Sequence, residues 1–194
     1  MKIWNEESKD HRDALLYAMG VDTKDVEKPV IGIINSWNEM NPGHYHFKDI
    51  IDLLKDTIKE QGALPRELPV LGICDGMCSN TPGDNYSLPA RDLVSADVET
   101  LAELNSLDGM ILLSSCDKIV PGMLMAAARL DIPAIVISGG PMLSIRKNNC
   151  DLDLNSVFEA VGSYQAGKMN SDELLEIEDS ACVSCGSCSG MFTA

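Results

Sequence analysis

Two apolar segments decide the fold class of this 194-residue chain: GMILLS at residues 109–114 and IPAIVIS at residues 132–138. Both are nearly all apolar and contain β-branched side chains, a composition typical of strands buried on both faces of a parallel sheet. Residues 121–130, between them, have the length and apolar content of a helix. The three segments together predict a β-α-β unit, in which a helix joins two parallel strands.

The alternation of apolar and amphipathic segments extends along the rest of the chain. Further strands are expected over residues 30–34 and 69–74, and further helices over residues 6–19, 46–61, 88–105, 155–168 and 171–179. Polar loops follow the expected strands, which is where open α/β sheets place their ligand sites. We therefore predict one α/β domain over residues 1–194, with a mostly parallel sheet flanked by helices on both faces in three layers. A cysteine-rich end occupies residues 181–194.

The charge of the chain excludes several classes of partner. It has 15 Lys and Arg against 30 Asp and Glu, a formal net charge of −15, which argues against nucleic acid and anionic membrane surfaces. No apolar run approaches the roughly 20 residues of a membrane-spanning helix. The N-terminal residues are charged where a signal peptide would be apolar. We expect a cytoplasmic protein in a reducing compartment.

Cys116, Asp117 and Lys118 follow segment 109–114 closely and place a thiol, a carboxylate and an amine side by side. A thiolate binds soft iron or zinc and a carboxylate binds hard magnesium, so two metals of different softness could meet here. The alternative is an exposed turn before the helix that Pro121 begins.

Two further groups of polar residues are candidates for metal binding. Asp75 lies at the tip of a glycine turn after the strand expected over residues 69–74, and it either binds a hard metal ion or forms the turn. His44 and His46 lie close to Pro42 and Gly43, and they either bind a metal as a pair or are hydrogen-bonded loop histidines.

Cys182, Cys185 and Cys188 form two CxxC steps, a spacing that suits a metal better than a disulfide framework. The run resembles the start of a bacterial ferredoxin motif, but Phe192 stands where the fourth cysteine would be. A zinc site would need a fourth ligand from elsewhere in the chain. Three reduced, buried thiols are the alternative without a metal.

Five segments carry a family resemblance. They are NSWNE at residues 35–39, YSLPAR at 86–91, CDKIVPGMLMA at 116–126, SGGPM at 138–142 and CGSCSGMFTA at 185–194. In this order they resemble the dihydroxy-acid dehydratase family, which also includes phosphogluconate and sugar-acid dehydratases. The resemblance covers residues 28–194. It implies a lyase that depends on an iron–sulfur cluster and magnesium, and that removes water from a 2,3-dihydroxy carboxylic acid to give a 2-keto acid for branched-chain amino-acid synthesis.

The family pattern also implies roles for individual residues. Cys116 and Cys188 would hold the cluster, and Asp75, Asp117 and Lys118, the last in a carboxylated form, would bind magnesium. Family members with a two-iron cluster carry a third cysteine at the position of Gly43. Both a 2Fe-2S and a 4Fe-4S cluster therefore stay open, the latter with a third ligand from Cys74, Cys78, Cys182 or Cys185.

The resemblance further implies that much of the family's chain lies beyond these residues. That second part supplies a serine base, another magnesium ligand and a lid, so we expect no catalytic residue in this chain and no turnover by it alone. The full-length form is expected to be a homodimer. A sugar-acid dehydratase of the same family, a stand-alone metal-binding protein, and a metal-free fragment that self-associates through exposed apolar surface are the alternatives.

Overall fold

A parallel sheet forms the centre of the molecule. The computed structural model describes residues 6–147 and 149–187, and within them the main sheet has four strands in the order β2-β1-β3-β4. All three strand pairs are parallel. The strands are β1 (Val30–Asn35), β2 (Leu64–Pro69), β3 (Gly109–Ser114) and β4 (Ala134–Ser138).

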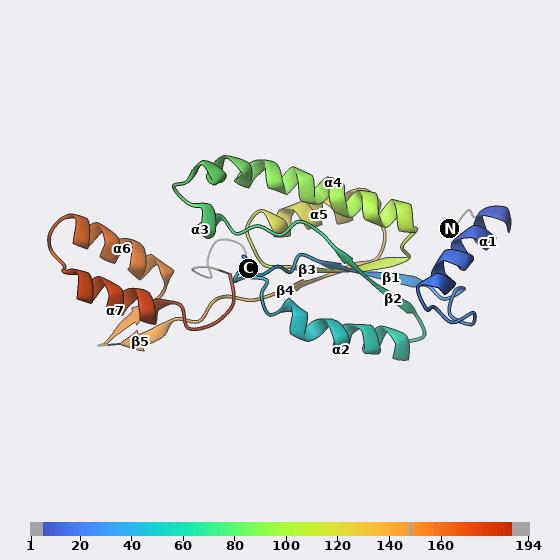
Figure 1. Ribbon diagram of the computed structural model, residues 1–194, viewed down its shortest axis with the longest axis horizontal. Helices are drawn as coiled ribbons and strands as arrows, with labels where there is room; N and C mark the ends of the chain where they lie inside the picture. The colour runs from blue at the N-terminus through green and yellow to red at the C-terminus, as the bar shows by residue number, and fades with distance from the viewer. Residues whose placement is uncertain (1–5, 148, 188–194) are drawn as a thin grey trace.

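Helices cover both faces of this sheet, so the predicted three-layer α/β architecture is confirmed. Helices α4 (Ser87–Asn105) and α5 (Ile119–Leu130) lie on one face, and α2 (Phe47–Glu60) lies on the other (Figure 1). Val94, Val98 and Met123 pack with Leu112 in the core of the first face. Phe47, Ile51, Ile58, Ile33 and Leu113 form the core of the second face.

The strand expected over residues 69–74 was misplaced. Strand β2 spans Leu64–Pro69, and only the amide of Val70 continues the ladder, donating to the carbonyl of Asn35 at 3.0 Å. Val70 and Cys74 are buried in the core cluster that contains residues of α4, so the apolar character of this segment reflects packing beside the sheet. Strand β2 carries Pro65 and Pro69; among the described residues it pairs only with β1, and an edge strand tolerates proline because its outer amides have no ladder partner.

The two segments that predicted the sheet differ in burial. Strand β3 is central, and Leu112 and Leu113 are both fully buried. Strand β4 pairs only with β3 among the described residues, and Ile135 is 64% exposed, so the expectation that this strand is buried on both faces was wrong.

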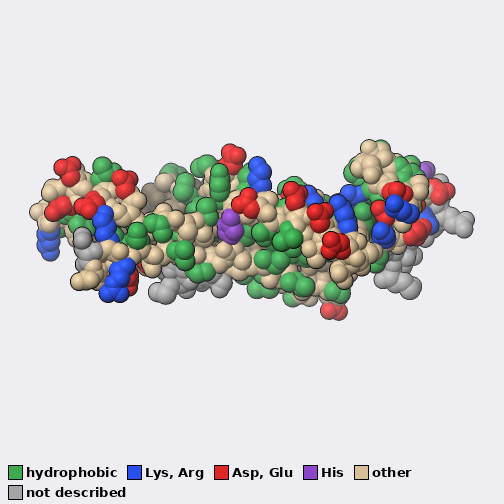
Figure 2. Space-filling view, turned by 90° about the horizontal axis from the view of Figure 1, so that it is seen from below, with side chains coloured by type: hydrophobic (Ala, Val, Ile, Leu, Met, Phe, Trp, Pro, Cys, Tyr) green, Lys and Arg blue, Asp and Glu red, His purple; other side chains and the backbone are tan. Residues whose placement is uncertain are grey.

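Hydrophobic side chains gather in the middle of the face seen from below, next to a band of charged ones (Figure 2).

Shorter elements complete the described chain. Helices α1 (Glu6–Ala18), α6 (Leu154–Gln165) and α7 (Ser171–Ala181) agree with the sequence prediction to within a few residues. The antiparallel hairpin of β5 (Ile145–Lys147) and β6 (Cys150–Leu152), helix α3 (Asp75–Cys78) and the 3-10 turn η1 (Pro82–Tyr86) were not predicted. The hairpin, α6 and α7 lie beyond one end of the sheet (Figure 1). None of the helices described is long and apolar enough to cross a membrane.

Candidate metal centre at the carboxyl edge of the sheet

The loops after all four parallel strands meet at one edge of the sheet, because parallel strands end on the same side. The loop after β1 carries residues 36–46, and the segment after β2 leads to Asp75. The loop after β3 carries Cys116, Asp117 and Lys118, and the loop after β4 carries residues 139–142. The main sheet thus gathers polar segments that are distant in sequence.

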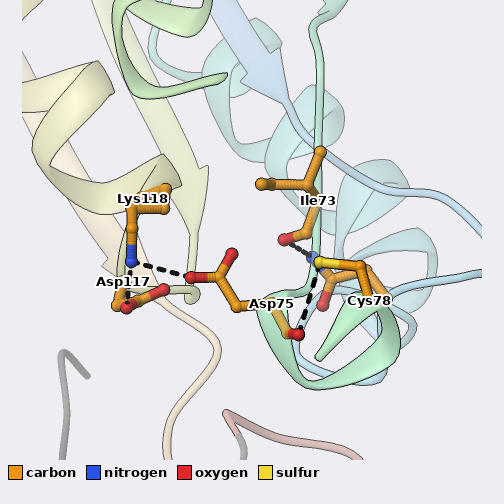
Figure 3. Close-up of polar contacts among 6 residues, drawn as sticks. Ile73, Asp75, Cys78, Asp117 and Lys118 are labelled. Atoms are coloured by element: carbon orange, nitrogen blue, oxygen red, sulfur yellow. Dashed lines mark hydrogen bonds and ion pairs between the residues drawn. The ribbon is translucent and has the colours of Figure 1, made fainter. Parts of the chain in front are cut away.

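Asp75, Asp117 and Lys118 converge at this edge (Figure 3). The Lys118 Nζ lies 2.7 Å from the Asp75 Oδ2 and 2.5 Å from the Asp117 Oδ2. Asp75 stands 43 residues away from Lys118 in sequence, so the fold creates this contact. The structure therefore brings together the three residues expected to bind magnesium.

The charges of this cluster favour a protonated lysine when no metal is bound. Burial alone would lower the pKa of Lys118, but its hydrogen bonds to Asp117 and Asp75 and their negative charges outweigh that effect and raise the pKa. The other oxygen of Asp75, Oδ1, is buried and has no hydrogen-bond partner among the described residues. A buried carboxylate oxygen without a donor is costly, and a hard cation would satisfy it.

Cys116 lies beside this cluster and is only 5% exposed. Its thiol donates to the Asn41 Oδ1 at 3.2 Å. A Cβ atom added at Gly43 would lie 3.1 Å from the Cys116 Sγ. Gly43, the position for which the family resemblance implies a third cysteine in two-iron members, is therefore the immediate neighbour of Cys116.

The cysteine-rich end packs against the same loops. The Gly186 amide donates to the Pro42 carbonyl at 3.0 Å, and the Ser187 amide donates to the Gly140 carbonyl at 2.9 Å. A Cβ atom at Gly186 would lie 2.6 Å from the Pro141 carbonyl oxygen, so only glycine allows this approach. Residues 186 and 187 are thus held next to Gly43. Cys188, the second expected cluster ligand, lies outside the described residues.

The four cysteines considered as a third ligand differ in their surroundings. Cys74 is buried in the same core cluster as Cys116. Cys78 is half-buried, and its thiol donates to the Asp75 carbonyl at 3.4 Å. Cys182 and Cys185 are exposed, and Cys185 directly precedes the Gly186 contact. No group of three or more His, Cys, Asp or Glu side chains suited to a metal ion occurs in the part of the chain that the structure describes.

His44 connects these loops. It is fully buried, and its Nε2 accepts the amides of Ser115 at 3.0 Å and Cys116 at 3.3 Å. This assigns the ring proton to Nδ1, which donates to the Ser36 carbonyl at 2.9 Å. Burial lowers the pKa of His44 to about 4, so the ring is neutral at pH 7.

Of the two alternatives that the sequence left for His44, the hydrogen-bonded loop histidine is confirmed, although its contacts with the loop after β3 were not predicted. The described structure makes it a hydrogen-bonded loop histidine. His46 is half-buried, with its Nδ1 unpartnered among the described residues, and it packs near Gly139. The two histidines do not form a metal-binding pair, because both ring nitrogens of His44 are engaged by the backbone.

Comparison with known proteins gives a matching family model and several similar relatives. Residues 28–194 match the family model described as "Dihydroxy-acid/6-phosphogluconate dehydratase N-terminal". The chain is 54% identical over 184 residues to a protein of Acetivibrio thermocellus named dihydroxy-acid dehydratase, an alignment that covers 95% of this chain and 33% of the relative.

Two more relatives bear the same name. One from Maridesulfovibrio salexigens is 50% identical over 188 residues, which cover 97% of this chain and 34% of the relative. One from Pyrococcus abyssi is 50% identical over 184 residues, which cover 95% and 33%. The chain spans about a third of the length of the curated relatives it matches.

Proposed function

Because the chain belongs to the dihydroxy-acid/6-phosphogluconate dehydratase family, we propose that it is the cluster- and magnesium-binding N-terminal domain, residues 1–194, of a dihydroxy-acid dehydratase. The reaction is removal of water from a 2,3-dihydroxy carboxylic acid to give a 2-keto acid, a step in branched-chain amino-acid synthesis. The observation that carries the proposal is the convergence of Asp75, Asp117 and Lys118 at one point of the sheet edge. The names of the relatives support the same substrate class.

Asp75, Asp117 and Lys118 are proposed to hold magnesium. When bound, magnesium would hold the carboxylate and 2-hydroxyl of the substrate and make the proton at C2 easier to remove. The unpartnered Oδ1 of Asp75 fits a hard cation. Lys118 joins this set by losing its proton and adding carbon dioxide to Nζ, which releases one further proton and leaves an anionic carbamate. That change replaces a repelling ammonium group with oxygen donors.

Cys116 and Cys188 are proposed to hold the iron–sulfur cluster. When bound, a cluster iron with an open position would act as a Lewis acid toward the departing 3-hydroxyl. Asn41 accepts the hydrogen bond of the Cys116 thiol, and Gly43 lies directly beside the sulfur. We place the base, the lid and the contacts of a homodimer in the part of the family chain that these residues do not span.

Anaerobic reconstitution with iron and sulfide tests the cluster site. We expect the 194-residue chain to bind iron and sulfide in stoichiometric amounts with visible absorption, and Cys116→Ser and Cys188→Ser to lose both. Cys150→Ser is the matched control, because Cys150 is exposed on the hairpin strand β6. A folded chain without iron, or variants at 116 and 188 that bind iron as the control does, would refute these ligands.

Calorimetric titration with magnesium in bicarbonate buffer tests the second site. Asp75→Asn should weaken binding by about tenfold or more, because a hard cation loses an anionic oxygen ligand. Asp92→Asn on α4 should leave the affinity unchanged, since the Asp92 side chain is 65% exposed and forms an ion pair with the adjacent Arg91. Equal affinities of the two variants would remove Asp75 from the site.

A further inference from the structure

His44 occupies a junction of three loops at the carboxyl edge of the sheet. The Ser36 carbonyl that it contacts follows β1, and the Ser115 and Cys116 amides that it accepts follow β3. Gly72, after β2, closes the third side: a Cβ atom there would lie 2.1 Å from the Ser36 carbonyl oxygen and 3.1 Å from the His44 Nδ1. The ring therefore sits between the loops after β1, β2 and β3.

The ring also supplies an acceptor for two buried backbone amides that follow the end of β3. Ser115 is fully buried and Cys116 nearly so, hence their amides have no access to bulk water. A buried amide without an acceptor costs about 1–3 kcal/mol. The Nε2 of His44 accepts both amides, and they come from the residue that bears the thiol and the residue before it. Fixing these two amides fixes the peptide plane from which the Cys116 side chain projects.

The ring itself is held from several sides. The backbone amide of His44 donates to the Asn41 carbonyl at 3.0 Å, which closes a turn. The ring plane stacks on Phe47, with ring centroids 5.1 Å apart and an angle of 21° between the planes. Phe47 is fully buried in the core under α2. The position of the Cys116 backbone is thereby tied to the packed core rather than to a solvent-exposed loop.

From these contacts we propose that His44 is a positioning residue, which sets the direction of the Cys116 thiol through the Ser115 and Cys116 amides and does not itself bind iron. The part of this inference that concerns iron rests on the proposed function, whereas the part that concerns the amides and the thiol does not. A ligand role would require Nε2 to give up both backbone amides that it accepts in this structure.

Two conservative variants separate the acceptor from the donor of the ring. His44→Gln places an amide oxygen near the position of Nε2, so it can accept the two backbone amides. His44→Asn places an amide nitrogen near the position of Nδ1, so it can donate to the Ser36 carbonyl but offers nothing to the loop after β3. Both variants remove the imidazole, and both are checked for folding by circular dichroism.

Hydrogen exchange and thiol modification of the metal-free 194-residue chain test the positioning role. In His44→Asn we expect exchange of the Ser115 and Cys116 amides and alkylation of Cys116 to accelerate by about tenfold or more, because a buried hydrogen bond that resists local opening is lost. In His44→Gln both rates should stay within about threefold of the unmodified chain. Alkylation of the exposed Cys150 serves as the internal control and should not change. Equal rates in the two variants would overturn the proposal.

Anaerobic loading with iron and sulfide then separates a positioning role from a ligand role. His44→Gln should retain iron with the spectrum of the unmodified chain, while His44→Asn should give an altered spectrum or less iron. Loss of iron from His44→Gln with normal amide protection would show that the imidazole binds iron, which overturns the inference and leaves the other ligands intact. If the unmodified chain also binds no iron, the proposed function fails and the amide and thiol rates still decide the role of His44.

Discussion

Gly43 is the position for which the family resemblance implies a third cysteine in two-iron members. A Cβ atom there would lie 3.1 Å from the Cys116 Sγ and 3.1 Å from the Asn41 Oδ1. The first distance suits a side chain that shares a bond or a metal with Cys116. The second is tight, so Asn41 has to shift by a small amount. A single glycine thus decides whether a further thiol can lie directly beside Cys116.

We predict that Gly43→Cys adds a thiol that reacts with Cys116. In air the variant should form an internal disulfide, visible as a mass loss of two hydrogens and as protection of Cys116 from alkylation. After anaerobic reconstitution its visible and electron paramagnetic resonance spectra should differ from those of the unmodified chain. Gly43→Ala controls for the added Cβ alone. A variant in which the new thiol and Cys116 are both alkylated as fast as Cys150 would contradict this geometry.

At the same scale, sequence reasoning named candidate site residues but not the contacts that hold them in place. Cys116, Asp117 and Lys118 are adjacent in sequence, Asp75 lies in a glycine turn and Cys188 in a CxxC step, and the family resemblance implied a role for each of them. The contacts of His44 join residues 71 and 72 positions apart. Such contacts arise from the packing of loops after different strands, which no local pattern encodes. The candidate metal ligands could therefore be named in advance, whereas the contacts of His44 with the backbone of Ser115 and Cys116 could not.

At the scale of the element, the packing around a helix decides how a glycine substitution in it changes stability. Gly122 lies in α5 where this helix crosses α4, and a Cβ atom there would meet the Arg91 carbonyl oxygen at 2.7 Å and the Val94 Cβ at 3.0 Å. Gly162 lies in α6, and a Cβ atom there would meet nothing within 4 Å. The same replacement should have opposite effects at the two positions.

We predict that Gly122→Ala lowers the free energy of unfolding by about 1–3 kcal/mol, because two helices must separate. Gly162→Ala should raise it by about 0.5–1 kcal/mol, because alanine restricts the unfolded chain and favours the helix. Urea unfolding followed by circular dichroism measures both. A stabilised Gly122→Ala variant would mean that α4 and α5 do not approach as closely as described.

A second prediction concerns the contact between β2 and α2, and it depends on pH. Burial alone would raise the pKa of Glu67. Its hydrogen bonds to Lys55 and Asn35 and the positive charge of Lys55 have a larger effect in the opposite direction, so the pKa of Glu67 lies below its ordinary value of 4.5. A carboxylate with a depressed pKa stabilises the fold at pH values above 4.5, and this stabilisation is lost as the pH falls through the folded-state pKa. Lys55 and Glu67 are 31% and 33% exposed, which keeps the effect modest.

Glu67→Gln should therefore lower the free energy of unfolding by about 0.5–1 kcal/mol at pH 7. The difference from the unmodified chain should shrink steadily below pH 4.5. Asp56→Asn is the control on α2, because its pair with Lys59 is 3.6 Å long and both side chains are mostly exposed, and it should change stability little. A pH-independent effect of Glu67→Gln would assign it to packing instead of charge.

The secondary structure was predictable for elements long enough to show an apolar run or a helical pattern. Strand β3 was placed correctly because it is central and apolar on both faces. The apolar segment after Pro69 was mistaken for a strand, since burial beside the sheet and burial within it leave the same composition. Strands β5 and β6, each three residues long, are too short to show a period.

At the scale of the whole molecule, strand β4 and the loop after it present apolar surface. Ile135 is 64% exposed and Val136 is 38% exposed, and Leu143 in the following segment is 62% exposed. Within the described residues the outer side of β4 has no neighbouring strand. An exposed apolar edge strand is a template for pairing with another chain. The chain spans about a third of its relatives, so an edge of this kind is compatible with a surface that the rest of a longer chain covers.

The last prediction follows from this edge. We expect the 194-residue chain to self-associate at micromolar concentration, and Ile135→Lys to shift it toward the monomer in sedimentation velocity runs, because edge lysines oppose strand pairing. Leu53→Lys is the matched control: Leu53 is equally apolar and 68% exposed, but it lies on α2, where an added charge affects no strand edge. If both variants dissociate the assembly alike, general hydrophobicity drives it. If Ile135→Lys has no effect on an associated chain, another surface forms the contact and the β4 edge is already protected.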